Sequence, residues 1–335
     1  MTIELKVIDI YSSLWTDSIS TFTTSTFAGS AWLDIIKNGL HCRDFCIAGF
    51  EDENIVCVMP AVVINIGFVN ILYSSIPFGG IFGSPGHIQS FLNELPYFCR
   101  KHHLHKIRIQ KDPFDNSYNI LNYSKSLSLF PVLSTDYPAD FNFTQTLSSS
   151  IRANIRRAQK SGVIVKLAEN RDDVCSFFDL YLSSMRRNKA VAKYPLQYFL
   201  QMYDIMRDKG ILRMYIASIK DKAIAGIITV RSNRVSHYLH GGSDAAYSSL
   251  RANDLLFFHA ITDCIVDDVQ FFSFGGTSPH DSELLRFKMK WGSEIRNVYT
   301  YDLDVNKLFC NLLKIAESLL KNKYATLLYN KMMNR

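Results

Sequence analysis

The segment 235–292 constrains the fold most, because four predicted elements follow one another in it without a long break. Alternating apolar residues predict a first strand that stops at Gly241-Gly242, and a short apolar run closed by Gly275-Gly276 predicts a second, buried strand. Apolar residues at helical spacing predict a helix after each strand. The predicted elements are the strand Val235–Leu239, the helix Asp254–Val266, the strand Phe271–Phe274 and the helix Ser282–Lys290. Such an α/β unit places its strand ends at a common edge, where ligands usually bind.

The rest of the chain predicts the same mixture of elements in a repeated order. Each half reads as helix, three strands, helix and strand, and the pairs Gly79-Gly80 and Gly241-Gly242 fall at matching places. Local predictions in the first half include a helix capped by Ser30 and one strand over Ile55–Ile64. We therefore predict an α/β fold with mixed sheets, made of two tandem copies of one domain. The predicted limits are 1–146 and 147–304, separated near a polar segment at 144–150, with a C-terminal helix in 305–335.

Composition and charge exclude several classes of protein. Hydrophobic residues make up 47% of the chain and charged residues 20%, as in globular proteins, and 13% aromatic residues argue against disorder. The 37 basic and 31 acidic residues give a net charge of +6, which suits an anionic partner but is too small to imply stable DNA binding. The seven cysteines form no C-x-x-C motif, and no run reaches the roughly 18 apolar residues of a membrane span. Without a signal peptide at the N-terminus, these features predict a cytoplasmic protein with reduced thiols.

Four motifs resemble those of the Fem-type aminoacyltransferases and their GNAT-fold N-acyltransferase relatives. They are Y-L-H-G-G-S at 238–243, F-S-F-G-G at 272–276, R-F-K-M-K-W-G at 286–292 and a basic helix at 152–163. The family carries Y-x-x-G-G-S, F-D-F-G-G and F-K-x-x-F-G at the first three places. The resemblance implies two GNAT-like domains. One departure is Ser273, which stands where the family often has Asp.

The resemblance also implies an activity: transfer of an acyl or aminoacyl group to an amine of a cell-envelope precursor, either of peptidoglycan or of a surface polysaccharide. The donor would be an acyl-CoA or another thioester, or an aminoacyl-tRNA, with no permanently bound cofactor. The acceptor would be nucleotide- or lipid-linked, and tRNA would be a partner if it carries the acyl group. Ser273 keeps an alternative open, in which the chain is a non-catalytic GNAT-fold protein that binds an anionic nucleotide- or lipid-linked precursor.

Three side chains are candidates for the chemistry. The match to the family's F-K motif implies that Lys288 lies at the donor end of the site, where a fixed ammonium can polarise a carbonyl or hold a phosphate. Alternation along the strand predicts Tyr238 and His240 on one face, and an imidazole with a pKa near 6.5 can take a proton at neutral pH. Packing roles in the core or cleft are the alternative for each of them. We find no G-x-S-x-G motif, so no covalent enzyme intermediate is predicted.

Basic side chains of two predicted helices are candidates for binding an anionic substrate. Arg152 and Arg156 lie four residues apart on one stripe, and Arg186 and Arg187 end the next long helix. Such clusters suit a pyrophosphate or a tRNA acceptor end, although a solvated helix face is the more common situation. Two further substrate-binding candidates come from the resemblance alone: Phe287 of the F-K motif, and Lys37 in W-x-x-x-x-K.

Two common binding motifs are missing. CoA-dependent GNAT enzymes carry R/Q-x-x-G-x-G/A where a helix N-terminus binds the pyrophosphate, but the matching Leu250–Asp254 has no glycine. Asp254 at a helix start also disfavours an anion there. The cluster His102-His103-x-His105 has no carboxylate or thiol nearby, so no metal site is predicted.

The C-terminal segment 305–335 repeats apolar residues at helical spacing, from Leu308, Leu312 and Ile315 onward. Six of its residues are basic and one, Glu317, is acidic, so it carries most of the net charge. A basic amphipathic helix either packs on its own domain or makes a peripheral contact with an anionic membrane. The second alternative would place the protein at the inner face of the membrane.

Overall fold

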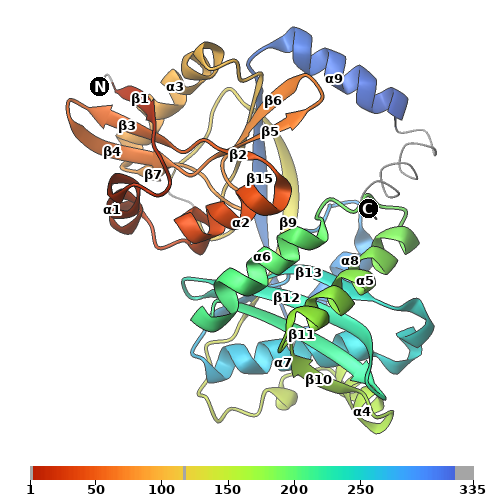
Figure 1. Ribbon diagram of the computed structural model, residues 1–335. Coiled ribbons are helices and arrows are strands. Elements are labelled where there is room, and N and C mark those ends of the chain that lie inside the picture. Colours follow the sequence, from red (N-terminus) through yellow and green to blue (C-terminus); the bar gives the residue numbers. More distant parts are fainter. Residues whose placement is uncertain (1–2, 116–117, 321–335) are drawn as a thin grey trace. The chain divides into compact units, whose positions relative to one another are not determined.

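The computed structural model describes residues 3–115 and 118–320, and in 316–320 only the backbone. These residues form two compact units, shown in Figure 1. Unit 1 contains the chain up to Ser128 and the segment that begins at Asn297, whereas unit 2 contains Leu129–Arg296. Strands β9 (Ser124–Ser134) and β15 (Glu294–Asp304) therefore contribute residues to both units. The domain limits 1–146, 147–304 and 305–335 stay a prediction, because compact units follow spatial contacts and not the order of the chain.

Unit 2 is built on a mixed sheet in the order β10-β11-β12-β13-β14-β9. All neighbours are antiparallel except β13 and β14, which are parallel. The other strands of this sheet are β10 (Ile164–Leu167), β11 (Leu212–Ile219), β12 (Lys222–Ser232), β13 (Val235–Ser243) and β14 (Phe271–Ser273). The helices are α4 (Ser149–Lys160), α5 (Arg171–Arg187), α6 (Leu196–Met206), α7 (Ala252–Val266) and α8 (Ser282–Met289), and the 3-10 turns are η2 (Phe143–Gln145), η3 (Arg207–Lys209) and η4 (Ala245–Leu250).

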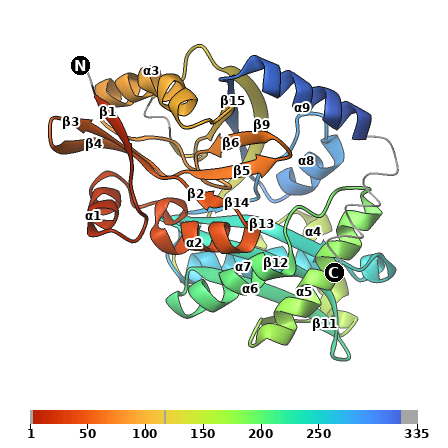
Figure 2. The ribbon, with the colours of Figure 1, turned by 45° about the horizontal axis from the view of Figure 1, so that its top comes forward.

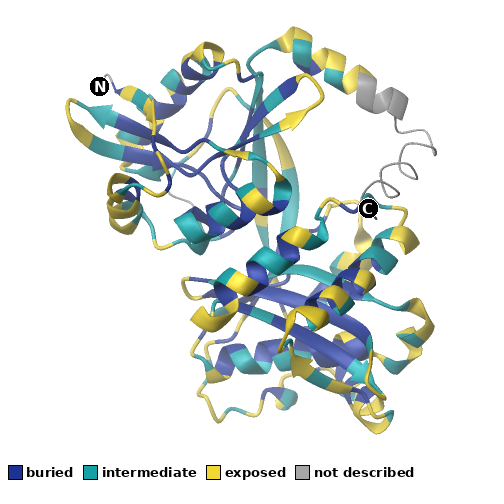
Figure 3. Cartoon of the chain, in the orientation of Figure 1, coloured by how far each residue is buried: buried dark blue, intermediate teal, exposed yellow. Residues whose placement is uncertain are grey.

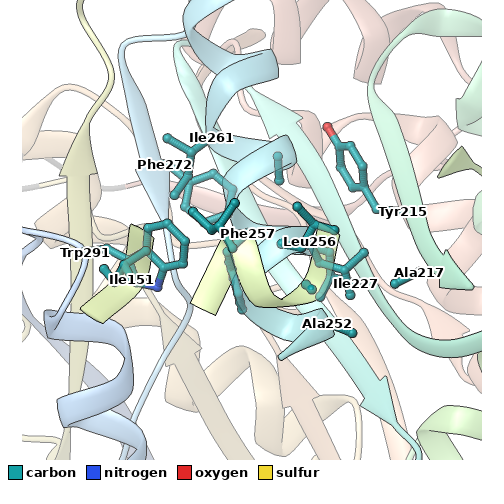
Figure 4. Close-up of a cluster of buried hydrophobic side chains, with 14 of the residues drawn as sticks. Ile151, Tyr215, Ala217, Ile227, Ala252, Leu256, Phe257, Ile261, Phe272 and Trp291 are labelled. Atoms are coloured by element: carbon teal, nitrogen blue, oxygen red, sulfur yellow. The ribbon is translucent and has the colours of Figure 1, made fainter. Parts of the chain in front are cut away.

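Two pairs of helices cover the two faces of this sheet, so unit 2 has three layers (Figure 1). Helices α5 and α6 pack on one face, and α7 with α4 on the other. Alternation along the strands explains the division: Ile227 joins the core of α4 and α7, whereas its neighbour Gly226 faces Phe177 of α5. Figure 4 shows the core between the sheet and helices α4 and α7, in which Phe257 lies beside Phe272 and Trp291.

The pair Gly241-Gly242 does not end strand β13, contrary to the prediction, because both glycines pair with β12 and the strand continues to Ser243. A Cβ on Gly242 would lie 2.4 Å from the amide nitrogen of Tyr181, and one on Gly241 would lie 2.3 Å from the hydroxyl of Tyr238. The glycines therefore allow close packing against the strand, which is the other common reason for glycine inside a sheet.

Unit 1 has two sheets, in the orders β1-β3-β4-β7 and β15-β8-β6-β5-β2. Helix α3 packs against β1, β4 and β7 of the first and against β8 of the second (Figure 2). The strands are β1 (Glu4–Val7), β2 (Arg43–Asp44), β3 (Ile47–Glu51), β4 (Asn54–Met59), β5 (Val62–Ile66), β6 (Val69–Tyr73), β7 (Phe82–Gly83) and β8 (Lys106–Gln110). The helices are α1 (Ser13–Phe22), η1 (Thr26–Ala28), α2 (Ser30–Leu40), α3 (Pro85–Lys101) and α9 (Lys307–Leu320).

The two units repeat one topology. In unit 1, β5 is antiparallel to β6, β6 is parallel to β8, and β8 is antiparallel to β15. In unit 2, β12, β13, β14 and β9 show the same succession, and in each unit a helix (α3 or α7) connects the parallel strands. The predicted tandem α/β architecture is confirmed, although β9 follows β8 in the chain and completes the sheet of unit 2, whereas β15 completes that of unit 1.

Three details of the first half differ from prediction. The run Ile55–Ile64 forms two strands, β4 and β5, which separate at Pro60 because proline donates no ladder hydrogen bond. The N-cap of α2 is Gly29, so Ser30 is the first helical residue. The pair Gly79-Gly80 lies outside the named strands, where Gly79 forms an isolated bridge with Lys111, whereas Gly241-Gly242 lies within β13. Among the described residues, no helix is long and apolar enough to cross a membrane.

Candidate functional site

The candidate site is the place in unit 2 where the parallel strands β13 and β14 part. The strands pair only from Val235 to His237, opposite Phe271 to Ser273. Strand β14 then ends, while β13 continues to Ser243 with β12 on its other edge. In the strand pairings that the structure describes, this edge of β13 has no partner beyond His237. Its peptide groups can therefore bind a ligand, as at the strand ends of other α/β sheets.

Lys288 holds the turn at which β14 ends. Helix α8 starts at its N-cap Asp281, whose Oδ1 accepts a hydrogen bond from Leu284 N at 3.0 Å. Its last turn buries Lys288, which is 3% exposed, with Nζ donating to the carbonyl oxygens of Gly275 at 3.0 Å and Gly276 at 3.1 Å. Burial lowers the pKa of this lysine to about 7, opposed by the charge of Asp281. These contacts make Lys288 a positioning residue, and its direct action on a carbonyl stays a prediction.

Gly275 connects this lysine to strand β13. It has φ 72°, and a Cβ on it would lie 2.8 Å from the carbonyl oxygen of Tyr238. The side chain of the neighbouring Ser273 is fully buried, and its Oγ accepts from Gly275 N at 3.4 Å. The serine that replaces the family's aspartate thus contacts the same turn that Lys288 binds.

Tyr238 and His240 lie on opposite faces of the sheet, so their predicted common face is wrong. Tyr238 pairs with Thr229 and His240 with Ile228, which leaves Leu239 as an extra residue in a β-bulge. The ring of Tyr238 packs edge-on against Phe257 of α7, with centroids 5.1 Å apart. Burial raises the pKa of Tyr238 to about 12, so this phenol stays protonated at neutral pH.

His240 lies among aromatic rings of α5, of α6 and of Tyr194 just before α6. Its ring centroid is 4.6 Å from that of Tyr194, 5.2 Å from that of Phe199 and 6.4 Å from that of Tyr181. Its Nε2 lies 3.3 Å from the hydroxyl of Tyr198. Burial among these rings lowers the pKa of His240 to about 3. The imidazole is therefore neutral at pH 7 but a weaker base than the sequence implied.

We expect the pH profile of activity to show no contribution from His240 between about pH 5 and pH 8, since a group with a pKa of about 3 does not titrate there. The variant His240→Gln should keep the shape of the kcat/KM profile and lose less than the roughly 100-fold that removal of a general base costs. The exposed His280, changed to Gln, is the matched control. An acidic limb near pH 6.5 that disappears only in His240→Gln would show that His240 is the base.

At the far end of β13, Arg187 contacts the last residue of the strand. It donates to the Ser243 carbonyl oxygen at 2.8 Å and to the Oγ of Ser184 and of Ser243 at 3.2 and 3.3 Å. Ser184 Oγ also accepts from Ser243 N at 2.9 Å. Arg186 is exposed on the same helix end. Of these two predicted binding residues, Arg187 thus fixes α5 to the strand, and Arg186 projects into solvent.

The basic stripe of α4 is only partly free. Arg152 donates to the carbonyl oxygen of Leu147 at 2.6 Å, whereas Arg156 is exposed. Between them on the helix, Asn154 Nδ2 donates to Asp254 Oδ2 at 2.9 Å, and Lys290 forms an ion pair with the same carboxylate. Asp254 is 4% exposed in the first turn of α7. A carboxylate of the protein therefore occupies the first turn of α7, the segment that matches the CoA-binding motif of GNAT enzymes in the sequence.

The two remaining candidates have structural contacts of their own. Phe287 packs edge-on against Phe257 at 5.6 Å, and the Lys290 ammonium lies 4.2 Å from its ring centroid. Lys37 lies in α2 of unit 1, where it pairs with Asp44 at 3.1 Å. A hollow of about 250 Å³ in unit 2, lined in part by Tyr203 and Arg207, contains none of the predicted residues.

Two arrangements of site residues escaped the sequence analysis. The first is the contact of Asn154 and Lys290 with Asp254: the sequence indicated the carboxylate but not these two partners, which are far from it in the sequence. The second is the group of aromatic rings around His240, in which Tyr194, just before α6, stacks on Tyr198, four residues later in the chain. That spacing was the one available signal, and alone it does not distinguish a binding site from a core.

The comparisons with known proteins concern the domain family and the fold. The acetyltransferase (GNAT) domain family matches residues 146–289. The chain is similar in structure to FemX, with a TM-score of 0.66 and 13% identity over 92% of this chain and 99% of that one. It is also similar to a tandem GNAT protein from the clavulanic acid biosynthesis pathway, with a TM-score of 0.60 and 9% identity over 90% and 98% of the two chains. It is similar as well to L-PGS from Bacillus licheniformis, with a TM-score of 0.58 and 12% identity over 96% of each chain.

No curated protein matches the chain in sequence. The structural similarities show the fold, and the family match adds the activity class, because it covers the β13–β14 junction and all of α8. Residues 146–289 therefore match the GNAT acetyltransferase domain family, and the chain is an acyltransferase whose tandem fold is similar to that of FemX.

Proposed function

We propose that this acyltransferase moves an acyl or aminoacyl group from an activated donor to an amine of a cell-envelope precursor, of peptidoglycan or of a surface polysaccharide. The Fem-type motifs at 238–243, 272–276 and 286–292 support this acceptor class, and all three lie around the β13–β14 junction. The similarity of the fold to FemX and L-PGS is consistent with it.

The choice between acyl-CoA and aminoacyl-tRNA as the donor depends on one observation, the buried carboxylate of Asp254. A helix N-terminus attracts a pyrophosphate through its free amides and its dipole. Here an acidic side chain occupies the first turn of α7, held by Lys290 and Asn154, and no glycine allows a phosphate to approach the backbone closely. The usual CoA site is thereby weakened. We infer that an aminoacyl-tRNA is a better donor than an acyl-CoA, with the exposed arginines of α4 and α5 as contacts for its phosphates.

The reaction needs no covalent enzyme intermediate. The acceptor nitrogen attacks the carbonyl carbon of the donor, a C–N bond forms, and the C–O bond to the tRNA ribose breaks. The amine loses a proton and the departing ribose oxygen gains one. The open edge of β13 supplies peptide dipoles for the carbonyl, while Lys288 holds the turn beside it in place.

The direct test compares donors on the purified protein. Radiolabelled aminoacyl-tRNA and radiolabelled acetyl-CoA are each incubated with a nucleotide-linked peptidoglycan precursor, a lipid-linked one and an amino sugar, and labelled product is separated and counted. We expect transfer from aminoacyl-tRNA to a peptidoglycan precursor. Transfer from acetyl-CoA alone would overturn the choice of donor, and transfer to none of these acceptors would overturn the proposed acceptor class.

The double variant Arg152→Gln, Arg156→Gln should raise the KM for the anionic donor. Hydrogen bonds to charged groups contribute about 1.5–3 kcal/mol each, so the loss should be several kcal/mol at most and should shrink in high salt. The variant Lys209→Gln, Lys220→Gln removes the same charge from exposed positions elsewhere in unit 2 and is the control. Equal KM values for both variants at every salt concentration would show that the α4 stripe is merely solvated.

A further inference from the structure

The apolar stripe of α9 is exposed in unit 1. Leu308, Leu312 and Ile315 follow one another at helical spacing and are 66%, 46% and 58% exposed. Figure 3 shows yellow, exposed bands along this helix. Monomeric proteins rarely expose several large apolar side chains on one stripe, and such a stripe usually marks an interaction surface.

Other residues hold α9 in place, so the exposed stripe is not its packing face. Phe309 stacks on the ring of His105, with centroids 4.5 Å apart and planes at 8°. Cys310 is buried, and its Sγ lies 3.2 Å from the carbonyl oxygen of His105, which also accepts from Asn306 N at 2.9 Å. The helix is therefore docked through its first turn, and the stripe points away from these contacts.

The turn between β5 and β6 extends the apolar surface. Ile66 and Phe68 are 36% and 50% exposed, and Phe68 packs edge-on against Phe309 with centroids 5.9 Å apart. We call the five exposed side chains the α9 patch: Ile66, Phe68, Leu308, Leu312 and Ile315.

Basic groups border the α9 patch. Lys307 and Lys314 are exposed on the helix itself, although Lys314 pairs with Asp304 at 2.7 Å. The exposed Lys101 ends α3 and the exposed His103 lies in the turn after it, where the carbonyl oxygen of His103 accepts from Asn70 Nδ2 at 3.1 Å. Asn70 belongs to β6, the second strand of the hairpin that carries Phe68.

We propose that the α9 patch docks the protein onto an anionic lipid surface. Apolar side chains beside lysines are the combination that binds at the headgroup boundary of an anionic bilayer. A second copy of the chain fits less well, because a twofold contact through this surface would bring the basic groups of both copies together. The proposal does not depend on the reaction, since it concerns binding and is tested without substrate.

The test is co-sedimentation of the full-length protein with vesicles of phosphatidylcholine alone and of phosphatidylcholine with phosphatidylglycerol. We expect binding to the anionic vesicles only, with a large decrease in high salt. The variant Leu312→Gln, Ile315→Gln should bind the anionic vesicles at least about tenfold more weakly than wild type, because apolar burial and charge act together. The matched control is Ile164→Gln, Leu167→Gln on β10, whose side chains are 59% and 46% exposed.

Three outcomes would overturn the proposal. The first is equal binding by wild type and the α9 variant. The second is a fall in melting temperature of the α9 variant beyond that of the control, which would show that the stripe is packed against protein. The third is an α9-dependent dimer in sedimentation equilibrium without vesicle binding. Transfer activity measured in detergent is a separate readout, so failure here leaves the proposed reaction untouched.

Discussion

Replacing Lys288 with methionine should lower kcat about 100-fold, because a displacement of about 1 Å in an element that positions the substrate costs about that much. The lysine binds the carbonyl oxygens of both Gly275 and Gly276, and methionine fills similar space without a donor. Two carbonyl groups then lose their partner, and the turn beside β13 loses its anchor. Arg286→Met removes a positive charge from an exposed site on the same helix and should leave kcat within about twofold.

The same substitution should change how stability depends on pH. Burial holds the pKa of Lys288 at about 7 in the folded state, whereas an unfolded lysine has a pKa of about 10.4. Between these values the unfolded state binds more protons, so the contribution of Lys288 to the free energy of unfolding rises with pH. Below about pH 7 both states are protonated, and the cost of the buried ammonium is present in full.

Urea unfolding of both proteins from about pH 6 to pH 9 measures this effect. The difference in unfolding free energy, wild type minus Lys288→Met, should rise above pH 7 by up to about 1.36 kcal/mol for each pH unit. Taking the difference removes the titration of other groups. Parallel curves, together with a wild-type kcat in a folded variant, would remove Lys288 from the site and leave it an ordinary buried lysine.

Replacing Gly242 with alanine should destabilise unit 2 by about 3 kcal/mol, at the upper end of what overpacking costs. The added Cβ would lie 2.4 Å from the Tyr181 nitrogen and 2.5 Å from the Leu180 carbonyl carbon, so the backbone of α5 has to move. That helix is tied to the same strand end by Ser184 and Arg187. A loss of activity should accompany the loss of stability.

Gly241→Ala is the matched comparison, because it adds the same methyl group one residue earlier. Its Cβ would meet the hydroxyl end of Tyr238, which can rotate away, so we expect a smaller loss of stability. Gly86→Ala meets nothing within 4 Å and should be neutral. Thermal unfolding of the three variants gives the melting temperatures for this comparison. A melting temperature of Gly242→Ala equal to that of Gly86→Ala would show that α5 does not press on the strand.

The sequence predicted the strands and helices of 235–292 well, because periodicity and turn residues act locally. It also predicted the repeated α/β architecture and, through four short motifs, the acyltransferase class that the family match confirms. The predictions that were wrong concern the roles of single residues inside these elements. A glycine pair indicates either the end of a strand or a close approach, and only the position of α5 distinguishes the two.

The bulge at Leu239 is the clearest case of a decision made by the tertiary structure. Alternation places Tyr238 and His240 on one face of a regular strand, but a single extra residue opposite Ile228 and Thr229 reverses the face of every residue after it. No local sequence pattern indicates that Leu239 is the extra residue, because the register of β13 depends on its pairing with β12. Tyr238 thus packs with α7, and His240 packs with α5 and α6.

By itself, the sequence determined which elements form, that they repeat, and which lysines and arginines are available for chemistry. Only the tertiary structure decided their state: Lys288 is buried with a pKa of about 7, His240 has a pKa of about 3, and Asp254 occupies the start of α7. The physical reason is that secondary structure depends on neighbours in the chain. Charge state and accessibility depend on residues that are distant in the sequence, and the fold brings them together.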